Sequence, residues 1–253
     1  MLRLSSRLMG VLLSATLLGA LSGALMGCGS ALPVGKKGEE AERLTDCMLG
    51  ALNAEGFAWA AAAQWRFAGH SYVWRRDLGL ARVELDDDER VYLNLRTQQA
   101  VAFEDGERLK GEALAEAHKS ALKAFHNDSF WPFAPFKVRD EGTTRAVVEL
   151  PQGRGLLVRY ASGGSTPGDS YLWHLNHECR PTKWQMWVSV IPIDGVEASW
   201  EGWQQGATGA WVSTSHSLFG LSFSVSDLKL VSRFEALELS DPWLEAEGWH
   251  SAE

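Results

Sequence analysis

The chain has 253 residues, with 24 basic and 32 acidic side chains and a formal net charge of −8. This acidic balance excludes a protein that holds nucleic acid or anionic lipid headgroups through its overall electrostatic field. About 200 residues remain once a signal segment is set aside, which fits one domain with a sizeable core.

The first 27 residues have the layout of a secretory signal. Arg3 and Arg7 give a short positive start, and residues 8–25 form a run rich in Leu, Ala and Gly. The small residue Gly27 precedes Cys28. An uncleaved membrane helix, for which the run is barely long enough to cross ~30 Å of hydrocarbon, and a different cleavage site remain as alternatives.

Residues 25–28, Leu-Met-Gly-Cys, resemble the lipobox of bacterial lipoproteins. There the cysteine thiol takes a diacylglyceryl group and the chain is cut just before it, so the resemblance implies lipid attachment at Cys28, which two acyl chains make stable. Gly29 follows, and in Gram-negative lipoproteins a residue other than Asp there implies sorting to the outer membrane, facing the periplasm or the cell surface. Loss of Arg3 and Arg7 leaves 22 basic against 32 acidic side chains, a net charge of −10.

Residues 28–38 include Pro33, Gly35 and Gly38 and predict a lipidated tether. From Glu39 the apolar positions follow a helical period, and Gly56 is expected to stop this helix. A second amphipathic helix is predicted over residues 112–125. Two prolines interrupt the aromatic segment 130–136, so we expect it to be irregular and to pack over an apolar surface as a lid.

Elsewhere the apolar period shortens to two, which is typical of half-buried antiparallel strands. After a meander within 62–103, strands are predicted over 146–150, 156–160, 171–175, 184–191, 198–203, 210–215, 219–225 and 228–231. The sequence therefore predicts an α+β, mostly antiparallel fold, a curved half-barrel sheet of about ten or eleven strands with two helices and the aromatic lid. We assign residues 39–240 to this single domain and residues 241–253 to a tail.

The chain has three cysteines. If Cys28 carries lipid, Cys47 and Cys179 remain. In an oxidising compartment an even pair is usually a disulfide. Two buried free thiols are the alternative.

A set of short motifs across residues 60–230 resembles an uncharacterised family of exported bacterial proteins. The motifs are Trp65-Arg-Phe67 with His70 and Tyr72, Asn127-Asp-Ser-Phe-Trp131, Pro135-Phe-Lys137, Asp140-Glu-Gly142, Thr166-Pro-Gly-Asp169 with Tyr171, and Trp200-Glu-Gly-Trp203. In layout this family is similar to the LolA/LolB-like superfamily of lipoprotein carriers and lipid-binding lipoproteins. The resemblance implies a half-barrel closed by helices and loops over an apolar cavity that takes a lipid or an acyl chain.

Large aromatic side chains on a concave sheet face suit such a cavity. The candidate ligand-binding residues are Trp65, Tyr72, Trp74, Trp131, Trp173, Trp184, Trp200 and Trp211. The alternative is that these side chains fill the core and leave no cavity.

A second set of candidates is polar and lies within the same motifs. It comprises His70, Asn127, Asp128, Lys137, Asp140 and Asp169. One interpretation is a binding or catalytic cleft built on His70, Asp128 and Asp169. The other is structural, with Asp128 and Asp169 in turns and Lys137 paired with Asp140. The sequence holds no nucleophile elbow and no phosphate-binding loop, so an enzyme is the less favoured hypothesis.

Residues 174–179 contain His174, His177, Glu178 and Cys179, which are metal-ligand types. An offset of three on a strand puts the two histidines on opposite faces, so we predict no metal site and no cofactor. The sequence therefore favours an envelope lipoprotein that binds a lipid, an acyl chain or a lipidated protein. An envelope scaffold that docks a protein partner and an exported enzyme are the alternatives, and the oligomeric state is left open.

Overall fold

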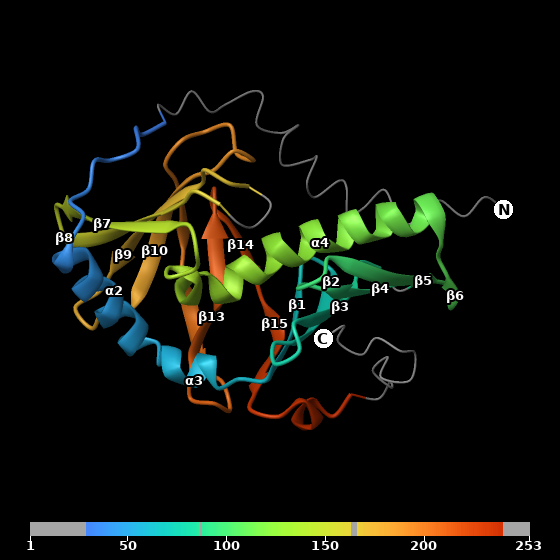
Figure 1. The fold of residues 1–253 in the computed structure, drawn as a ribbon. Helices are drawn as coiled ribbons and strands as arrows, with labels where there is room; N and C mark the ends of the chain where they lie inside the picture. The colour runs from blue at the N-terminus through green and yellow to red at the C-terminus, as the bar shows by residue number, and fades with distance from the viewer. Residues whose placement is uncertain (1–28, 87, 163–165, 240–253) are drawn as a thin grey trace.

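The computed structural model describes residues 29–86, 88–162 and 166–239. Within them, antiparallel strands form two curved, unclosed sheets with three α-helices (Figure 1). This is the α+β, mostly antiparallel half-barrel that the sequence predicts. The signal segment 1–27, Cys28 and the tail 241–253 lie outside the described residues.

The first sheet has seven strands in the order β15-β1-β2-β3-β4-β5-β6. Their bounds are β1 Ala62–Phe67, β2 His70–Arg75, β3 Leu80–Glu84, β4 Glu89–Asn94, β5 Gln99–Glu104, β6 Glu107–Arg108 and β15 Ser226–Val231. β1 to β6 form the predicted meander. β15 comes from the far end of the described chain and pairs with β1, with Val231 opposite Ala62.

The second sheet has eight strands in the order β12-β13-β11-β10-β9-β8-β7, with β14 paired to β13. Their bounds are β7 Thr143–Leu150, β8 Gly153–Tyr160, β9 Ser170–Leu175, β10 Pro181–Trp187, β11 Val196–Ser199, β12 Glu201–Gln205, β13 Trp211–Leu218 and β14 Leu221–Ser224. The prediction of one sheet with ten or eleven strands was wrong in this detail, because alternation reveals strands but not their partners. The predicted strand 198–203 also divides into β11 and β12 at Trp200.

The first predicted helix is shorter than expected. Helix α2 spans Glu39–Ala51, and Asn53 adopts a left-handed backbone and caps a separate short helix, α3 Ala54–Ala58. Gly56 therefore lies inside α3 and does not stop α2. A Cβ at Gly56 would come within 2.5 Å of the backbone oxygen of Thr208, so glycine serves close packing here.

The aromatic segment is not irregular, and that prediction was wrong. Helix α4 runs over Gly111–Phe133, includes Pro132, and continues into the 3₁₀ helix η2, Ala134–Lys137. Pro132 lies in the last turn, where its missing N–H removes a single helical hydrogen bond. Pro135 lies at the start of η2, a position that tolerates proline.

Two further segments differ from the prediction. Residues 219–220 form a turn rather than strand, so β14 is only four residues long. The expected tether lies on the second sheet, where Lys36 and Val147 exchange backbone hydrogen bonds. A second 3₁₀ helix, η3 Phe234–Leu237, follows β15.

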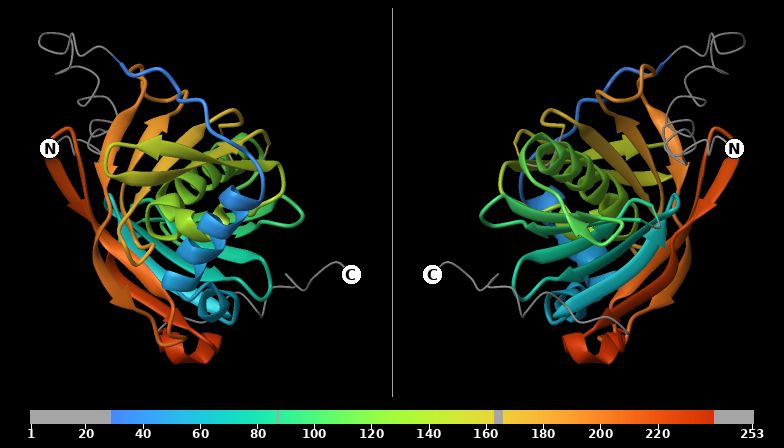
Figure 2. Two further views of the ribbon diagram at one scale, coloured as in Figure 1. Left: turned by 90° about the vertical axis from the view of Figure 1, so that its left-hand side faces the viewer. Right: turned by 90° about the vertical axis from the view of Figure 1, so that its right-hand side faces the viewer.

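The helices cover the sheets. α4 contacts β3, β4 and β5 of the first sheet and reaches β13 of the second, and Figure 2 shows it end-on against the curved sheets. α2 packs on β7 and β8. No helix in the described ranges combines the length and apolarity needed to cross a membrane.

Candidate functional site

The polar cluster near α4 forms because two buried faces meet. Ala117, Ala121 and Phe125 mark the buried stripe of α4, and Asp128 continues this stripe one turn later. Residues 70, 72 and 74 alternate along β2 and point the same way. A buried carboxylate on this stripe therefore meets polar side chains of β2.

Asp128 accepts hydrogen bonds from several side chains. The Tyr72 hydroxyl donates to Asp128 Oδ2 over 2.5 Å, and His70 Nδ1 lies 2.9 Å from the same oxygen. The Asn127 amide donates to Asp128 Oδ1 over 2.8 Å. Burial raises the pKa of Tyr72, and the nearby Asp128 carboxylate raises it further, so the hydroxyl keeps its proton and remains a donor. The cluster fastens α4 to the first sheet.

The other polar candidates do not join this cluster. Lys137 and Asp140 form an exposed ion pair of 2.6 Å. Asp169 is buried, accepts from Thr166 Oγ1 over 2.6 Å and from the Ser189 backbone over 3.1 Å, and so orders its own loop. Within the described part of the chain, no hydrogen bond links Asp169 to His70 or Asp128. The hypothetical three-residue cleft is therefore split between two separate networks.

The eight aromatic candidates divide between two cores. Trp65, Tyr72 and Trp74 belong to the first-sheet core, where the rings of Trp65 and Tyr72 stack at 4.8 Å. Trp131 lies between the cores and contacts both. The remaining residues pack in the second-sheet core: Trp173, Trp184, Trp200 and Trp211.

The second-sheet core contains a compact cluster of rings. The ring centroids of Trp173, Trp184 and Trp200 lie 4.8–4.9 Å apart, and His216 lies 4.8 Å from Trp200. All four side chains are at most 1% exposed. We call these four residues the aromatic cluster. The buried surface of the cluster is mostly apolar, although each indole carries one polar nitrogen and the imidazole carries two.

Four of the five polar nitrogens of the aromatic cluster have no partner among the described residues. The three indole Nε1 atoms and His216 Nε2 are buried and make no hydrogen bond within the described residues. A buried donor or acceptor without a partner costs about 1–3 kcal/mol, and such groups are rare in native proteins. Four of them in one cluster suit a ligand that brings both a hydrogen-bond acceptor and a donor.

His216 is the functional candidate that sequence reasoning missed. The predicted strand ended at residue 215, although Val212, Thr214 and His216 continue the alternation of buried positions. His216 Nδ1 lies 3.0 Å from the Ser199 carbonyl oxygen, which can only accept, so Nδ1 carries the proton and Nε2 the lone pair. Burial lowers the pKa of His216 to about 4, so the ring is neutral at pH 7.

Two helices cover the aromatic cluster. From α4, Phe130 and Trp131 approach Trp184 with centroid distances of 5.8 and 5.4 Å. From α2, Met48 and Leu52 are fully buried in the same core. The aromatic end of α4 thus takes the covering position that the sequence predicted for a lid, but as a helix.

The side chains of the aromatic cluster are at most 1% exposed, so the cluster is closed to solvent in the described structure. Its two principal surface hollows are lined elsewhere, one by residues 188–194 with Gly29 and the other by residues 58–61 with Arg76 and Asp77. The candidate aromatic residues therefore fill the cores in this state.

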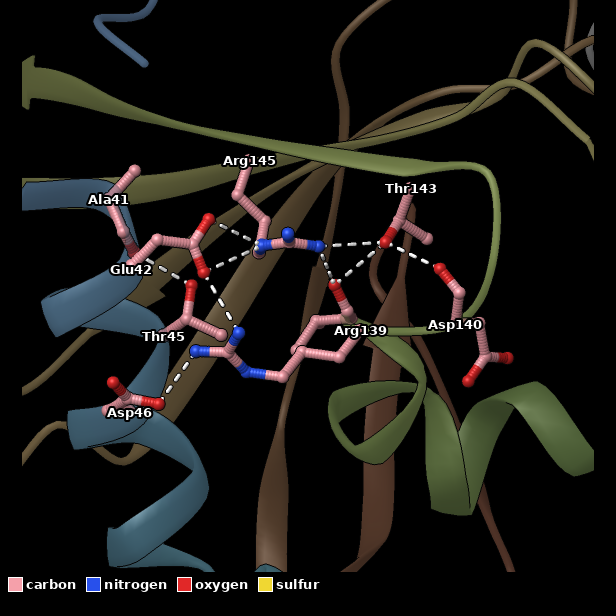
Figure 3. Close-up of polar contacts among 9 residues, drawn as sticks. Ala41, Glu42, Thr45, Asp46, Arg139, Asp140, Thr143 and Arg145 are labelled. Atoms are coloured by element: carbon pink, nitrogen blue, oxygen red, sulfur yellow. Dashed lines mark hydrogen bonds and ion pairs between the residues drawn. The ribbon is translucent and has the colours of Figure 1, made fainter. Parts of the chain in front are cut away.

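A disulfide and a network of ion pairs hold α2 in place. The predicted Cys47–Cys179 disulfide is present and joins α2 to the turn after β9. Figure 3 shows the network: Arg139 pairs with Glu42 at 2.9 Å and with Asp46 at 2.6 Å, and Arg145 pairs with Glu42 at 3.0 Å. Arg145 also donates to the Val138 carbonyl oxygen over 3.0 Å. These contacts join α2 to the segment that follows η2.

The side chains of residues 174–179 that could bind a metal make other contacts. Cys179 is in the disulfide, and His174 Nε2 lies 3.4 Å from Gln185 Oε1. His177 is exposed next to Glu178. No group of three or more His, Cys, Asp or Glu side chains in the described ranges is arranged to hold a metal ion.

Comparison with known proteins finds similarity to solved structures at low sequence identity. No protein-family model matches it, and no curated protein matches it. A DUF1329 family protein from Desulfovibrio piger is 9% identical, with a TM-score of 0.37, over 76% of this chain and 94% of that chain. A putative outer membrane lipoprotein-sorting protein domain from Vibrio parahaemolyticus is 10% identical, with a TM-score of 0.30, over 75% of this chain and 93% of that chain. At these values neither likeness decides the function, which has to be argued from the site.

Proposed function

We propose that this protein is an exported lipoprotein, anchored through Cys28 to the outer membrane, that binds a lipid, an acyl chain or a lipidated protein at the aromatic cluster. The signal layout of residues 1–27 and the lipobox-like Leu-Met-Gly-Cys support the anchor. The Cys47–Cys179 disulfide supports an oxidising compartment.

The observation that carries the proposal is the set of unpartnered nitrogens in the aromatic cluster. The indole groups of Trp173, Trp184 and Trp200 offer N–H donors, and His216 Nε2 offers an acceptor. An ester or amide carbonyl would accept from the indoles, and a neighbouring hydroxyl or amide N–H would donate to His216. The surrounding rings would pack along the acyl chain, with about 25 cal/mol gained per Å² of buried apolar surface.

Binding requires that the cover over the cluster opens. α2 is bonded covalently to the second sheet, so it is the fixed part of the cover. The end of α4 and η2 are joined to α2 through Arg139, whose ion pairs are exposed and worth roughly 0–1 kcal/mol each. We therefore assign the movement to the aromatic end of α4, residues 130–136.

A second candidate function rests on the close packing of the same residues. Trp173, Trp184 and Trp200 fill the core and line no cavity. This favours an envelope scaffold that docks a protein partner on its surface and never opens.

Native mass spectrometry of a soluble Cys28→Ser variant, compared with the same sample under denaturing conditions, tests the two candidates. We expect a lipid-sized mass that is lost on denaturation. Trp200→Phe, which removes one N–H from the cluster, should lower the ligand-bound fraction. Trp65→Phe is the matched control, because it removes a buried indole N–H from the first-sheet core. A protein that stays bare when offered membrane lipid would contradict binding and favour the scaffold.

A further inference from the structure

The first described residues after the proposed anchor are hydrogen-bonded to the folded domain. The Ser30 backbone N–H donates to the Asp194 carbonyl oxygen over 3.0 Å, and Trp187 Nε1 donates to the Ser30 carbonyl oxygen over 2.7 Å. A Cβ at Gly29 would lie 3.1 Å from the Asp194 backbone nitrogen, so Gly29 is packed closely on the same loop. Cys28 is bonded to Gly29, and consecutive Cα atoms are about 3.8 Å apart. The first described residues after Cys28, Gly29 and Ser30, are therefore held on the loop of residues 188–195.

Strand register places a second turn at the same end of this sheet. Met186 pairs with Val196, so the loop 188–195 joins β10 and β11 at that end. Ala198 pairs with Leu218 in the antiparallel β11–β13 ladder. Val196 is two residues before Ala198 and so lies level with Gly220, two residues after Leu218. The β13–β14 turn and the loop 188–195 thus leave the sheet at one end, and Figure 2 shows the start of the described chain next to that loop.

Both turns expose large apolar side chains. Val190 is 59% exposed, Leu221 57% and Phe219 38%. Phe219 and Gly220 form a two-residue turn in which both residues have a positive φ, 52° and 77°. Asn, Asp or Gly is preferred at the first position of such a turn, and a bulky aromatic residue there is strained. An exposed ring on a strained backbone is an outlier that points to a functional role for this turn.

Charge is sparse in the same two segments, where Asp194 is the one charged residue of the loop 188–195. Residues 188–193 read Val-Ser-Val-Ile-Pro-Ile, and residues 202–226 contain no Asp, Glu, Lys or Arg. In a chain with 22% charged residues, this end of the sheet is unusually suited to a low-dielectric neighbour.

We propose that this end of the second sheet lies on the lipid bilayer that holds the Cys28 lipid, with Val190, Phe219 and Leu221 entering the interface. The proposal rests on the anchor in the proposed function but not on ligand binding by the aromatic cluster. The anchor supplies a high local concentration, so a weak apolar contact suffices to orient the domain. Because the contact lacks basic side chains, it acts through apolar burial and not through attraction to anionic headgroups.

Hydrogen exchange of the full-length lipidated protein, in vesicles of phosphatidylethanolamine and phosphatidylglycerol, tests the orientation. Intact mass first establishes whether Cys28 carries lipid. We expect the amides of residues 188–195 and 219–221 to exchange about tenfold more slowly than in the soluble Cys28→Ser variant. Unchanged exchange at these residues in a lipidated protein would overturn the proposed orientation while leaving the anchor intact.

Vesicle sedimentation of the soluble Cys28→Ser variant gives an independent measurement that does not need the anchor. The triple variant Val190→Ser/Phe219→Ser/Leu221→Ser should weaken partitioning about tenfold, with little dependence on salt. Trp59→Ser is the control, because Trp59 is 72% exposed at the end of α3, away from both turns. Equal partitioning of the triple variant and the parent, or protection of the turns only when envelope proteins are added, would overturn the membrane contact, and the second outcome would point to a protein partner.

Discussion

The two sheets bury their aromatic side chains in different ways. In the first-sheet core the Tyr72 hydroxyl donates to Asp128, and this bond joins α4 to β2. In the second-sheet core the indole Nε1 atoms of Trp173, Trp184 and Trp200 and the Nε2 atom of His216 have no partner among the described residues. The covering helix α2 is held by a disulfide and exposed ion pairs. In the first-sheet core a buried hydrogen bond holds the covering helix, whereas in the second-sheet core the covering helix is held by contacts at the periphery of the core. A site that must open is expected in the second kind of core. The hydrogen bond from His216 Nδ1 to the Ser199 carbonyl oxygen lies within the sheet, so opening of the helical cover would not break it.

Among the variants that test this contrast, removal of the disulfide should lower the free energy of unfolding the most. The Cys47–Cys179 bond closes a loop with a sequence separation of 132 residues. The chain-entropy model gives about 5 kcal/mol for a loop of that length. The double variant Cys47→Ser/Cys179→Ser should lose about this much free energy of unfolding in urea titrations. A loss below about 1 kcal/mol would mean that the ion pairs alone hold α2.

Asp128→Ala tests the polar bonds of the first-sheet core. It removes the shared acceptor of Tyr72, His70 and Asn127, and hydrogen bonds to a charged group contribute roughly 1.5–3 kcal/mol each. We expect the free energy of unfolding to fall by about 3 kcal/mol in urea. Asp140→Ala, which breaks only the exposed pair with Lys137, is the control and should change it by less than about 1 kcal/mol. Equal losses in the two variants would contradict the structural role of Asp128.

The pH dependence of stability tests His216 in the second-sheet core. Burial lowers its pKa from 6.5 to about 4. Between these pH values the unfolded chain binds a proton at His216 that the folded chain does not bind. The stabilising contribution of the neutral ring is therefore complete above pH 6.5 and is lost as the pH falls toward 4. At about 1.4 kcal/mol per pH unit, a shift from 6.5 to about 4 makes the His216 contribution about 3–4 kcal/mol.

Urea titrations of His216→Gln across that pH range give the measurement. The variant should lose less stability on acidification than the parent, by the amount given above. His177→Gln, at an exposed position, is the control and should follow the parent. Parallel curves for His216→Gln and the parent would show that the buried ring is not the titrating group.

Arg139→Ala should have the smallest effect on stability. Its ion pairs with Glu42 and Asp46 are exposed, so the expected loss is about 0.5–1 kcal/mol, and added salt should reduce it further. Urea titrations of the variant and the parent at low and at high salt measure this contribution as the difference between their free energies of unfolding. If the end of α4 is the moving cover, the same variant should also exchange the backbone amides of residues 130–136 faster. Unchanged exchange there would assign the opening to another element.

The sequence predicted local features more reliably than pairings. Alternation in β1–β5 and the stripe of α4 follow from the periods of strands and helices, so these elements were visible in the chain. The aromatic segment was misread because proline appeared to forbid a helix, whereas Pro132 occupies the last turn, where the loss is one bond. His216 was missed because a polar residue gives no apolar signal, although its position in the alternation was available.

The amino-acid sequence by itself determined the fold class and the anchor-like Leu-Met-Gly-Cys motif, because composition and periodicity are local properties of the chain. It favoured a disulfide between Cys47 and Cys179 over two free thiols, and the structure contains that disulfide. Only the tertiary structure decided that the strands form two sheets, that Asp128 meets Tyr72 and His70 while Asp169 lies apart, and that four ring nitrogens share one buried cluster. It also decided that the residues after Cys28 rest on the loop 188–195. Such relations depend on contacts between residues distant in the chain, and no local pattern encodes which distant residues will meet.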